Sequence, residues 1–267
     1  QCRRAEGYAV VLGADRLDEA GPHLAGVPRA TGARVVALAG MLPATFGLGL
    51  RPLWDGGPVA TTGHAVTVVA MVKTLVLAMS RQGLDWSRCT VGMLGFGSIG
   101  QATLALARAR LGDPAGVLVR DPRVQLDDLG PADVILAAQS GGEVLDPWSL
   151  CPGTVVVDDS FPRSFDDAAA IERMVKHDDV LFVGGGMVDV GPLHRVSPFP
   201  EAEAVRARFG ARWLPGCHAE AILVAADPTL GPTVGPVTPE RAARVWSAVE
   251  AAGWTAAPLH LGAWTRE

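Results

Sequence analysis

The sequence contains very little lysine and tyrosine, and its cysteines are few and scattered. Lys73 and Lys176 are the only lysines among 267 residues, which leaves little scope for Schiff-base chemistry. The four cysteines form no Cys-x-x-Cys pair, and the six histidines show no paired ligand spacing. These absences argue against a disulfide framework and against a metal site, so we expect a reduced chain in the cytoplasm.

Basic residues are also in the minority. Twenty-three Lys and Arg against 28 Asp and Glu give a net charge of −5, which argues against a nucleic-acid partner. No signal peptide is evident, and the most membrane-like segment, Ala65 to Met79, is shorter than a span of about 20 residues and contains Lys73. We therefore expect that segment to be a buried helix, without integral membrane association.

Apolar residues are abundant, at 49% against 19% charged and with a mean hydropathy of +0.25, so the chain can bury a sizeable core. An early strand is predicted at 34–39, and a helix opened by Thr61-Thr-Gly-His64 is expected to end near Gly83. Short runs that are apolar throughout follow, as is typical of parallel strands covered on both faces: 90–94, 116–120, 133–138, 154–158 and 180–183.

This alternation predicts an α/β fold, a doubly wound Rossmann-type parallel sheet in residues 87–200. Helices are expected at 201–208, 217–226 and 239–252. We predict that residues 1–86 and 201–267 together form a second, smaller α-rich domain for substrate and catalysis.

A glycine-rich turn follows the first strand of the predicted sheet and opens a helix. It reads Gly95-Phe96-Gly97-Ser98-Ile99-Gly100, the G-x-G-x-x-G pattern in the context where it binds a dinucleotide. Gly95 would allow the tight turn, Gly97 would let the backbone approach a pyrophosphate, and Gly100 would let the helix pack on the strand. Free N–H groups at the helix start would bind the anion.

The next strand ends in Arg120-Asp121, where the adenine ribose of a dinucleotide is expected. Arg120 would pair with a 2′-phosphate and favour NADPH, whereas Asp121 would accept from a free 2′-hydroxyl and favour NADH. Asp121-Pro122 is also ordinary turn chemistry. We favour NADPH. Ser140, in the loop after the 133–138 strand, is a further candidate cofactor contact.

Cys217 follows Leu214-Pro215-Gly216, where a chain break meets the start of an Ala-rich helix. A helix N-terminus stabilises a thiolate, so a lowered thiol pKa is expected there. Glu220 has the spacing of a capping box for the N–H of residue 217 and would oppose the thiolate. A buried structural cysteine is the alternative. His64 is a weaker site candidate.

Several segments together resemble the cyanobacterial-type long-chain acyl-[acyl-carrier-protein] reductases. They are Ala37-Leu-Ala-Gly40, Thr61-Thr-Gly-His64, the glycine turn with Val117-Leu-Val-Arg120, Val155-Val-Val-Asp158 with Phe161-Pro162, Val183-Gly-Gly-Gly-Met-Val-Asp189, and Cys217-His-Ala-Glu220-Ala. The last matches the segment that carries that family's catalytic cysteine. The glycine turn is one residue shorter than in the family, and His64 and His218 replace its Asn and Phe.

The resemblance implies NADPH-dependent reduction of an acyl thioester, carried by acyl carrier protein or coenzyme A, to an aldehyde. Cys217 would be the nucleophile and would form an acyl-cysteine intermediate. Two alternatives stay open: another NAD(P)-dependent dehydrogenase of the amino-acid or hydroxy-acid type with a structural Cys217, or a non-catalytic NADP-binding regulatory protein.

Overall fold

A computed structural model describes residues 32–51, 56–142, 144–192, 212–262 and 264–265. Its largest sheet has six strands in the order β5-β4-β3-β6-β7-β8, all parallel except β5. The strands are β3 (Thr90–Leu94), β4 (Gly116–Asp121), β5 (Gln125–Leu126), β6 (Val134–Ala137), β7 (Val155–Asp158) and β8 (Leu181–Gly184). The predicted doubly wound α/β sheet is therefore confirmed.

The central strands are buried along their whole length, which is why their sequences are apolar without alternation. Helix α4 (Ser98–Leu111) connects β3 to β4, and α5 (Asp167–His177) connects β7 to β8 and packs on β8. The side chain of Asp166 caps α5 by accepting from the N–H of Ala169.

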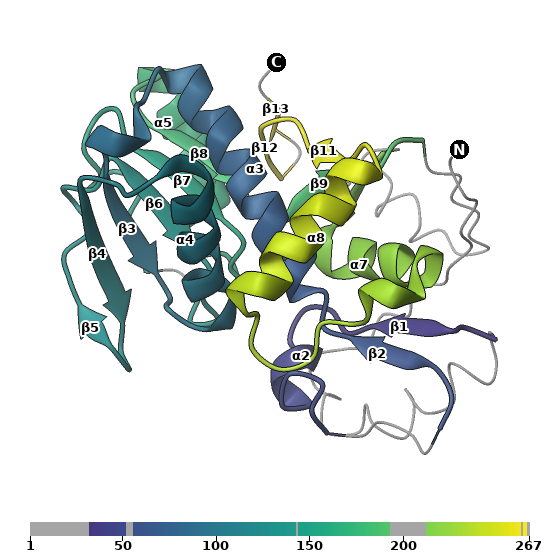
Figure 1. Cartoon of the computed structure of the whole chain (residues 1–267). Coiled ribbons are helices and arrows are strands. Elements are labelled where there is room, and N and C mark those ends of the chain that lie inside the picture. The colour runs from purple at the N-terminus through teal and green to yellow at the C-terminus, as the bar shows by residue number, and fades with distance from the viewer. Residues whose placement is uncertain (1–31, 52–55, 143, 193–211, 263, 266–267) are drawn as a thin grey trace.

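Helix α3 (His64–Gln82) is the main core helix and joins the sheet to the rest of the molecule. It packs against α4, β7, α7 (Gly216–Ala226) and α8 (Pro239–Ala251), and lies between the large sheet and α7 (Figure 1). Its length and composition would suit a membrane span, but 67% of its apolar window is buried inside the protein. The expected buried helix is confirmed, and the cytoplasmic location stays a prediction.

Both ends of the chain contribute to the remaining part of the molecule. Strands β1 (Val35–Ala37) and β2 (Val59–Thr61) pair in parallel and contact α7, and α2 (Leu42–Thr45) lies beside them (Figure 1). The second, smaller domain expected from both termini and its boundaries stay predictions. The helix expected at 201–208 lies outside the described residues.

Small elements that the sequence did not predict complete the fold. A three-stranded antiparallel sheet consists of β10 (Trp213–Pro215), β9 (Met187–Asp189) and β11 (Thr255–Ala256). β12 (His260–Leu261) pairs with β13 (Trp264–Thr265), and short 3-10 turns lie at η2 (Trp86–Arg88) and η3 (Pro228–Leu230). β10 leads directly into α7, so this small sheet fixes where α7 begins.

Candidate functional site

Four loops meet at the carboxyl-terminal edge of the six-stranded sheet, because β3, β6, β7 and β8 run parallel. They begin at Gly95, Ala138, Asp159 and Gly185. The N–H of Gln139 donates to Ser160 Oγ at 3.1 Å, and the N–H of Gly185 donates to the carbonyl of Asp158 at 2.8 Å. Ligands of open α/β sheets bind at this edge, so it is the candidate site.

The glycine turn has the geometry that its sequence predicts. Gly95 has a φ of +82°, and a Cβ there would lie 2.5 Å from the carbonyl oxygen of Ala138. A Cβ on Gly100 would lie 2.2 Å from the carbonyl oxygen of Gly95, so only glycine lets α4 begin this close to the turn. Gly97 is the N-cap residue of α4, and a Cβ there would meet one group within 4 Å, Nη2 of Arg123 at 3.6 Å.

The other predicted cofactor contacts serve partly to hold the turn. The N–H of Phe96 donates to Asp121 Oδ2 at 2.7 Å, and Ser98 Oγ accepts from the N–H of Val237 at 2.9 Å. The side chain of Ile99 packs against the core. Ser140 is exposed in the loop after β6, where the Gln139 side chain bonds Gly141 and Gly142. The contacts of Phe96, Ser98, Ile99 and Ser140 with a cofactor stay predictions.

Asp121 is bound by protein groups and is buried. Its Oδ1 accepts from the N–H of Arg123 at 2.9 Å and from Arg123 Nε at 3.1 Å, and its Oδ2 accepts from Arg123 Nη2 at 3.0 Å besides Phe96. The hydrogen bonds from Arg123 hold the pKa of this carboxyl well below its usual range. Asp121 therefore fixes the glycine turn, and turn chemistry accounts for it better than a free ribose partner.

Arg123, which sequence reasoning missed, lies beside the turn, with its guanidinium near Gly97 and 77% of its side chain exposed. Arg120 lies in a different place. It lines a cavity of about 260 Å³ together with residues 128–130, 144–146, 149 and 150, and no residue of the glycine turn is among that lining. The signal for Arg123 was its position two residues after Asp121, in the turn that ends the strand.

Cys217 lies in the first turn of α7, in a close contact between two helix starts. A Cβ on Gly63, the residue before α3, would lie 2.2 Å from the Cα of Cys217. A Cβ on Gly216 would lie 2.6 Å from the backbone nitrogen of Thr67 in α3. Glycines at 63 and 216 are thus needed for the starts of α3 and α7 to touch, and this contact fixes the position of the thiol.

The electrostatics of the thiol differ from the prediction. Burial raises the pKa of Cys217 to about 12, with a further increase from the carboxyl of Asp159. Backbone N–H groups of His218, Cys217 and Gly40 act in the opposite direction. The expected lowering of the thiol pKa is therefore wrong, because the local effect of the helix start is smaller than the effects of burial and of a nearby acid. Whether Cys217 is a nucleophile stays a prediction.

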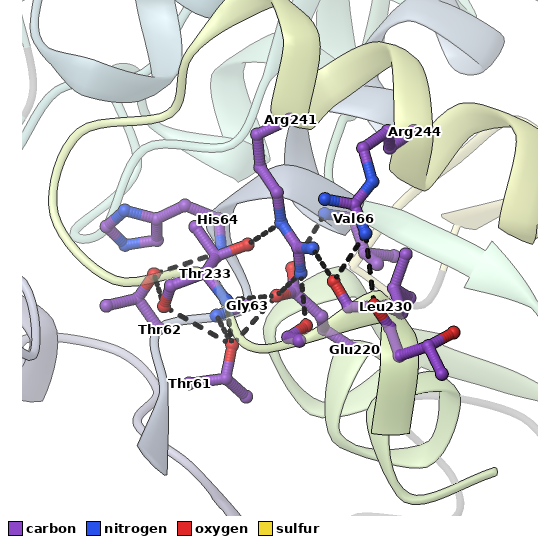
Figure 2. A network of polar contacts seen from close by, with 12 residues as sticks. Thr61, Thr62, Gly63, His64, Val66, Glu220, Leu230, Thr233, Arg241 and Arg244 are labelled. Carbon is purple, nitrogen blue, oxygen red and sulfur yellow. Dashed lines mark hydrogen bonds and ion pairs between the residues drawn. The ribbon is translucent and has the colours of Figure 1, made fainter. Parts of the chain in front are cut away.

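Glu220 does not form the predicted capping box. Its Oε2 accepts from the N–H of Val66 in α3 at 3.2 Å (Figure 2). Its Oε1 accepts from Thr61 Oγ1 at 2.8 Å, from the N–H of Thr233 at 2.9 Å and from Arg241 Nη2 at 3.0 Å. This fully buried carboxylate therefore joins α3, α7 and α8 instead of capping its own helix.

His64, the first residue of α3, follows Gly63 and so lies next to the Cys217 contact. Burial lowers the pKa of His64, and its Nδ1 has no hydrogen-bond partner among the described residues. The threonines expected to open α3 do bond its start: Gly63 is the N-cap residue, Thr61 Oγ1 accepts from the N–H of Gly63, and Thr62 Oγ1 accepts from the N–H of His64 at 3.5 Å. Within the described part of the chain no three His, Cys, Asp or Glu side chains are placed to bind a metal ion.

Two adjacent acids follow β7 and have different surroundings. Asp158 is buried and accepts from the N–H groups of Ser160 and Ser164, and Arg163 lies 3.6 Å from its Oδ2. Asp159 is half-buried, and no group within the described residues donates a hydrogen bond to its carboxyl. Burial, with the charge of Asp158, raises the pKa of Asp159 to about 7. Sequence reasoning missed the difference between these two acids.

The residues present fit a dinucleotide. Among the described residues, only Arg123 comes within 4 Å of where a side chain of the N-cap residue Gly97 would stand, and Gly97 has no side chain to cap the first N–H groups of α4, which suits a pyrophosphate. The exposed guanidinium of Arg123 is beside that space.

The chain is only distantly similar to the known proteins with which it was compared. No family model matches the chain. A curated relative, Aminotransferase PigE of Serratia sp. (strain ATCC 39006), is 28% identical over 250 residues, which are 84% of this chain and 27% of that protein. The chain thus spans about a quarter of the length of this relative.

Solved structures similar to the chain are mainly dehydrogenases. TP0037 of Treponema pallidum, a D-lactate dehydrogenase, has 14% identity and a TM-score of 0.39, with 82% of this chain and 80% of that one covered. NAD⁺-bound 3-phosphoglycerate dehydrogenase of Entamoeba histolytica has 16% identity and a TM-score of 0.38, with 76% and 74% covered.

These findings correct the expected family. The proteins to which the chain is similar are described as dehydrogenases and an aminotransferase, and they do not point to the long-chain acyl-[acyl-carrier-protein] reductases. The membership inferred from the ordered motifs is therefore wrong. The motifs are real features of the sequence, but a glycine turn, a strand ending in Asp158 and a helix start at Cys217 can follow from a doubly wound fold alone.

Proposed function

We propose that the chain is an NAD(P)-dependent oxidoreductase that interconverts a carbonyl and a hydroxyl or amino group, in the manner of a hydroxy-acid or amino-acid dehydrogenase. The observation that carries the proposal is the glycine turn, in which Gly95 and Gly100 permit the tight approach and Gly97 leaves the start of α4 open. A nicotinamide cofactor bound there supplies or accepts a hydride at the carboxyl edge of the sheet.

A preference for the phosphorylated cofactor, NADPH, is part of the proposal. Asp121 is occupied by Phe96 and Arg123, so it is poorly placed to accept from a free ribose hydroxyl. The exposed guanidinium of Arg123 could pair with a 2′-phosphate, and Arg120 lines the neighbouring cavity.

Within this proposal Cys217 is a protonated thiol at neutral pH, because its pKa is raised to about 12. A protonated thiol contributes packing and a weak hydrogen bond, and direct hydride transfer needs no covalent intermediate. A protonated Cys217 therefore favours a dehydrogenase over an enzyme that needs a cysteine nucleophile.

A second candidate is reduction of an acyl thioester through an acyl-Cys217 intermediate, with acyl carrier protein or coenzyme A as donor. The observation that favours it is the set of backbone N–H groups around the sulfur, from Gly40, Cys217 and His218, which would stabilise a thiolate or an oxyanion. The sulfur would become ionised only if substrate binding changed the surroundings of Asp159.

One set of assays tests the proposal and separates the two candidates. The purified chain is mixed with NADPH or NADH and with pyruvate, glyoxylate, hexanal or hexanoyl-coenzyme A, and cofactor oxidation is followed at 340 nm. The dehydrogenase proposal predicts turnover of a carbonyl probe that survives Cys217→Ala. Turnover of hexanoyl-coenzyme A alone, with an acyl adduct in intact mass spectra that Cys217→Ala abolishes, would establish the second candidate. No oxidation with any probe would count against both.

A further inference from the structure

The loop after β7 carries a carboxyl group, that of Asp159, to which no described residue donates a hydrogen bond. Asp159 begins this loop, and its N–H donates to the carbonyl of Ala137 at 2.9 Å, which extends the β6–β7 pairing by one residue. The side chain lies against the backbone of Gly186, where a Cβ would come 1.8 Å from Oδ1. Position 186 is thus glycine because the carboxyl of Asp159 occupies that space.

The same glycine connects Asp159 to the start of α7. The N–H of Gly216 donates to the carbonyl of Gly186 at 2.7 Å, and Cys217 is the next residue. One backbone contact thus links the segment beside the Asp159 carboxyl to the segment that carries the thiol, and the charge of Asp159 acts on the thiol. Asp159 therefore follows β7 at the carboxyl edge of the sheet, and its charge reaches the thiol at the start of α7.

Among the described residues, few titratable groups interact with Asp159. Asp158 precedes it, Arg163 lies in the same loop, and Cys217 comes from α7. The charge of Arg163 lowers the pKa of Asp159, but this effect is smaller than those of burial and of Asp158. Arg163 forms its ion pairs with Asp167, at 2.8 Å, and with Asp158. Both lysines are elsewhere, in ion pairs with Glu250 and Glu172.

We propose that Asp159 is the proton donor and acceptor of this site. The inference rests on the proposed oxidoreductase function. In the reducing direction the carbonyl carbon of the substrate gains the hydride that the bound cofactor supplies, and the C=O π pair moves onto the oxygen. The carboxyl O–H of Asp159 gives its proton to that oxygen. An alcohol and an Asp159 carboxylate result, and solvent returns the proton to the carboxylate.

The surroundings of Asp159 suit this role. A carboxyl with a pKa of about 7 is partly protonated at neutral pH, which is the condition for giving and taking a proton in one cycle. Its neighbour Asp158 accepts hydrogen bonds from backbone N–H groups and lies close to Arg163. Asp158 therefore holds the loop in place, whereas Asp159 is left for proton transfer.

Two measurements on the full chain test the inference, with Asp159→Asn as the variant and Asp113→Asn, an exposed acid on the α4–β4 connection, as the matched control. First, the carboxyl carbons of the chain are labelled with [¹³C]aspartate and titrated by NMR. We expect one signal that titrates near pH 7 in the wild type and in Asp113→Asn and that is missing in Asp159→Asn. An Asp159 signal that titrates below pH 5 would overturn the inference.

Second, the carbonyl probe that the wild type reduces fastest is assayed from pH 5 to pH 9. We expect Asp159→Asn to lower kcat about 100-fold or more with little change in KM, and to abolish the decline in reduction rate above pH 7. An unchanged kcat with an unchanged pH profile would overturn the inference. If the wild type binds reduced cofactor but reduces none of the probes, or binds no cofactor, the proposed function fails and the NMR titration alone decides the state of Asp159.

Discussion

At the scale of single residues, Cys217 shows that two effects on one thiol can act in opposite directions. A helix start and three backbone N–H groups favour the thiolate, whereas burial and Asp159 favour the thiol, and the second pair is the stronger. A sequence displays only the helix start, because burial, the N–H of Gly40 and the charge of Asp159 depend on the packing of distant segments.

We expect Cys217 to react slowly with iodoacetamide at pH 7 and about tenfold faster for each unit of pH up to about pH 11, since only the thiolate reacts. The rate is measured by mass spectrometry of the peptide that contains Cys217. Cys151, which is exposed, is an internal control for the reagent and should react faster at neutral pH. A plateau in the Cys217 rate near pH 7 would contradict the raised pKa.

Asp159 should also affect stability in a pH-dependent way. Its pKa is raised from an ordinary 3.8 to about 7, so the folded chain binds this proton more tightly than the unfolded chain does. The associated stability is fully present below about pH 4 and is lost as the pH rises through 7. Asp159→Asn should therefore have a higher Tm than the wild type at pH 8, with the difference shrinking toward pH 5. A difference independent of pH would show that Asp159 has an ordinary pKa.

The exposed side chain of Arg123 beside the glycine turn should affect the choice between NADPH and NADH. Removing a charge-assisted contact to a 2′-phosphate costs about 1.5–3 kcal/mol, so Arg123→Ala should weaken NADPH binding about tenfold or more and NADH binding much less. Fluorescence titrations of both cofactors measure this difference. Arg120→Ala is the comparison, and a larger loss of NADPH affinity in that variant would assign the phosphate to the cavity that Arg120 lines.

At the scale of helices, the contact between the starts of α3 and α7 depends on glycine. Gly63 and Gly83 flank α3 with nearly equal φ values of +69° and +65°, but only Gly63 has a neighbour within 4 Å. Gly83→Ala should cost about 1–2 kcal/mol of unfolding free energy for the left-handed conformation alone. Gly63→Ala should cost about 1–3 kcal/mol more, because its Cβ would overlap Cys217. Urea denaturation measures the unfolding free energy of both variants, and an equal loss in the two would contradict the close contact at Gly63.

The buried pair of Glu220 and Arg241 holds three helices together. Glu220→Gln should destabilise the chain by about 3–5 kcal/mol, since it leaves a buried guanidinium without its counter-charge. The matched control is Glu172→Gln, which breaks an exposed pair with Lys176 and should cost at most about 0.5 kcal/mol. Similar losses in the two variants would mean that the network in Figure 2 contributes little.

At the scale of the whole molecule, much of the fold could be predicted from the sequence, because strands covered on both faces have to be apolar. The five parallel strands of the large sheet, the helix 64–82 and the glycine turn all lie where their residues indicate, whereas the two-residue strand β5 was not predicted. The small sheet of β9, β10 and β11 could not be predicted, because strands of two or three residues have no periodic pattern.

The site was only partly predictable. The turn at Gly95–Gly100 is a local motif, but the separation of Asp158 from Asp159 and the joining of Val66 to Glu220 depend on contacts between segments far apart in the sequence. The ordered motifs also led to a wrong family, because several of them are features of the sheet and its loops and are not specific to one reaction.

The central claim is that the start of α4 binds a nicotinamide dinucleotide. The most direct measurement is titration of the purified chain, and of Gly97→Val, with NADPH followed by cofactor fluorescence. The open space at Gly97 predicts saturable binding by the wild type and at least a tenfold loss in Gly97→Val, with unchanged circular dichroism. A folded wild-type chain that does not bind NADPH or NADH, or a valine variant that binds as tightly as the wild type, would contradict the claim.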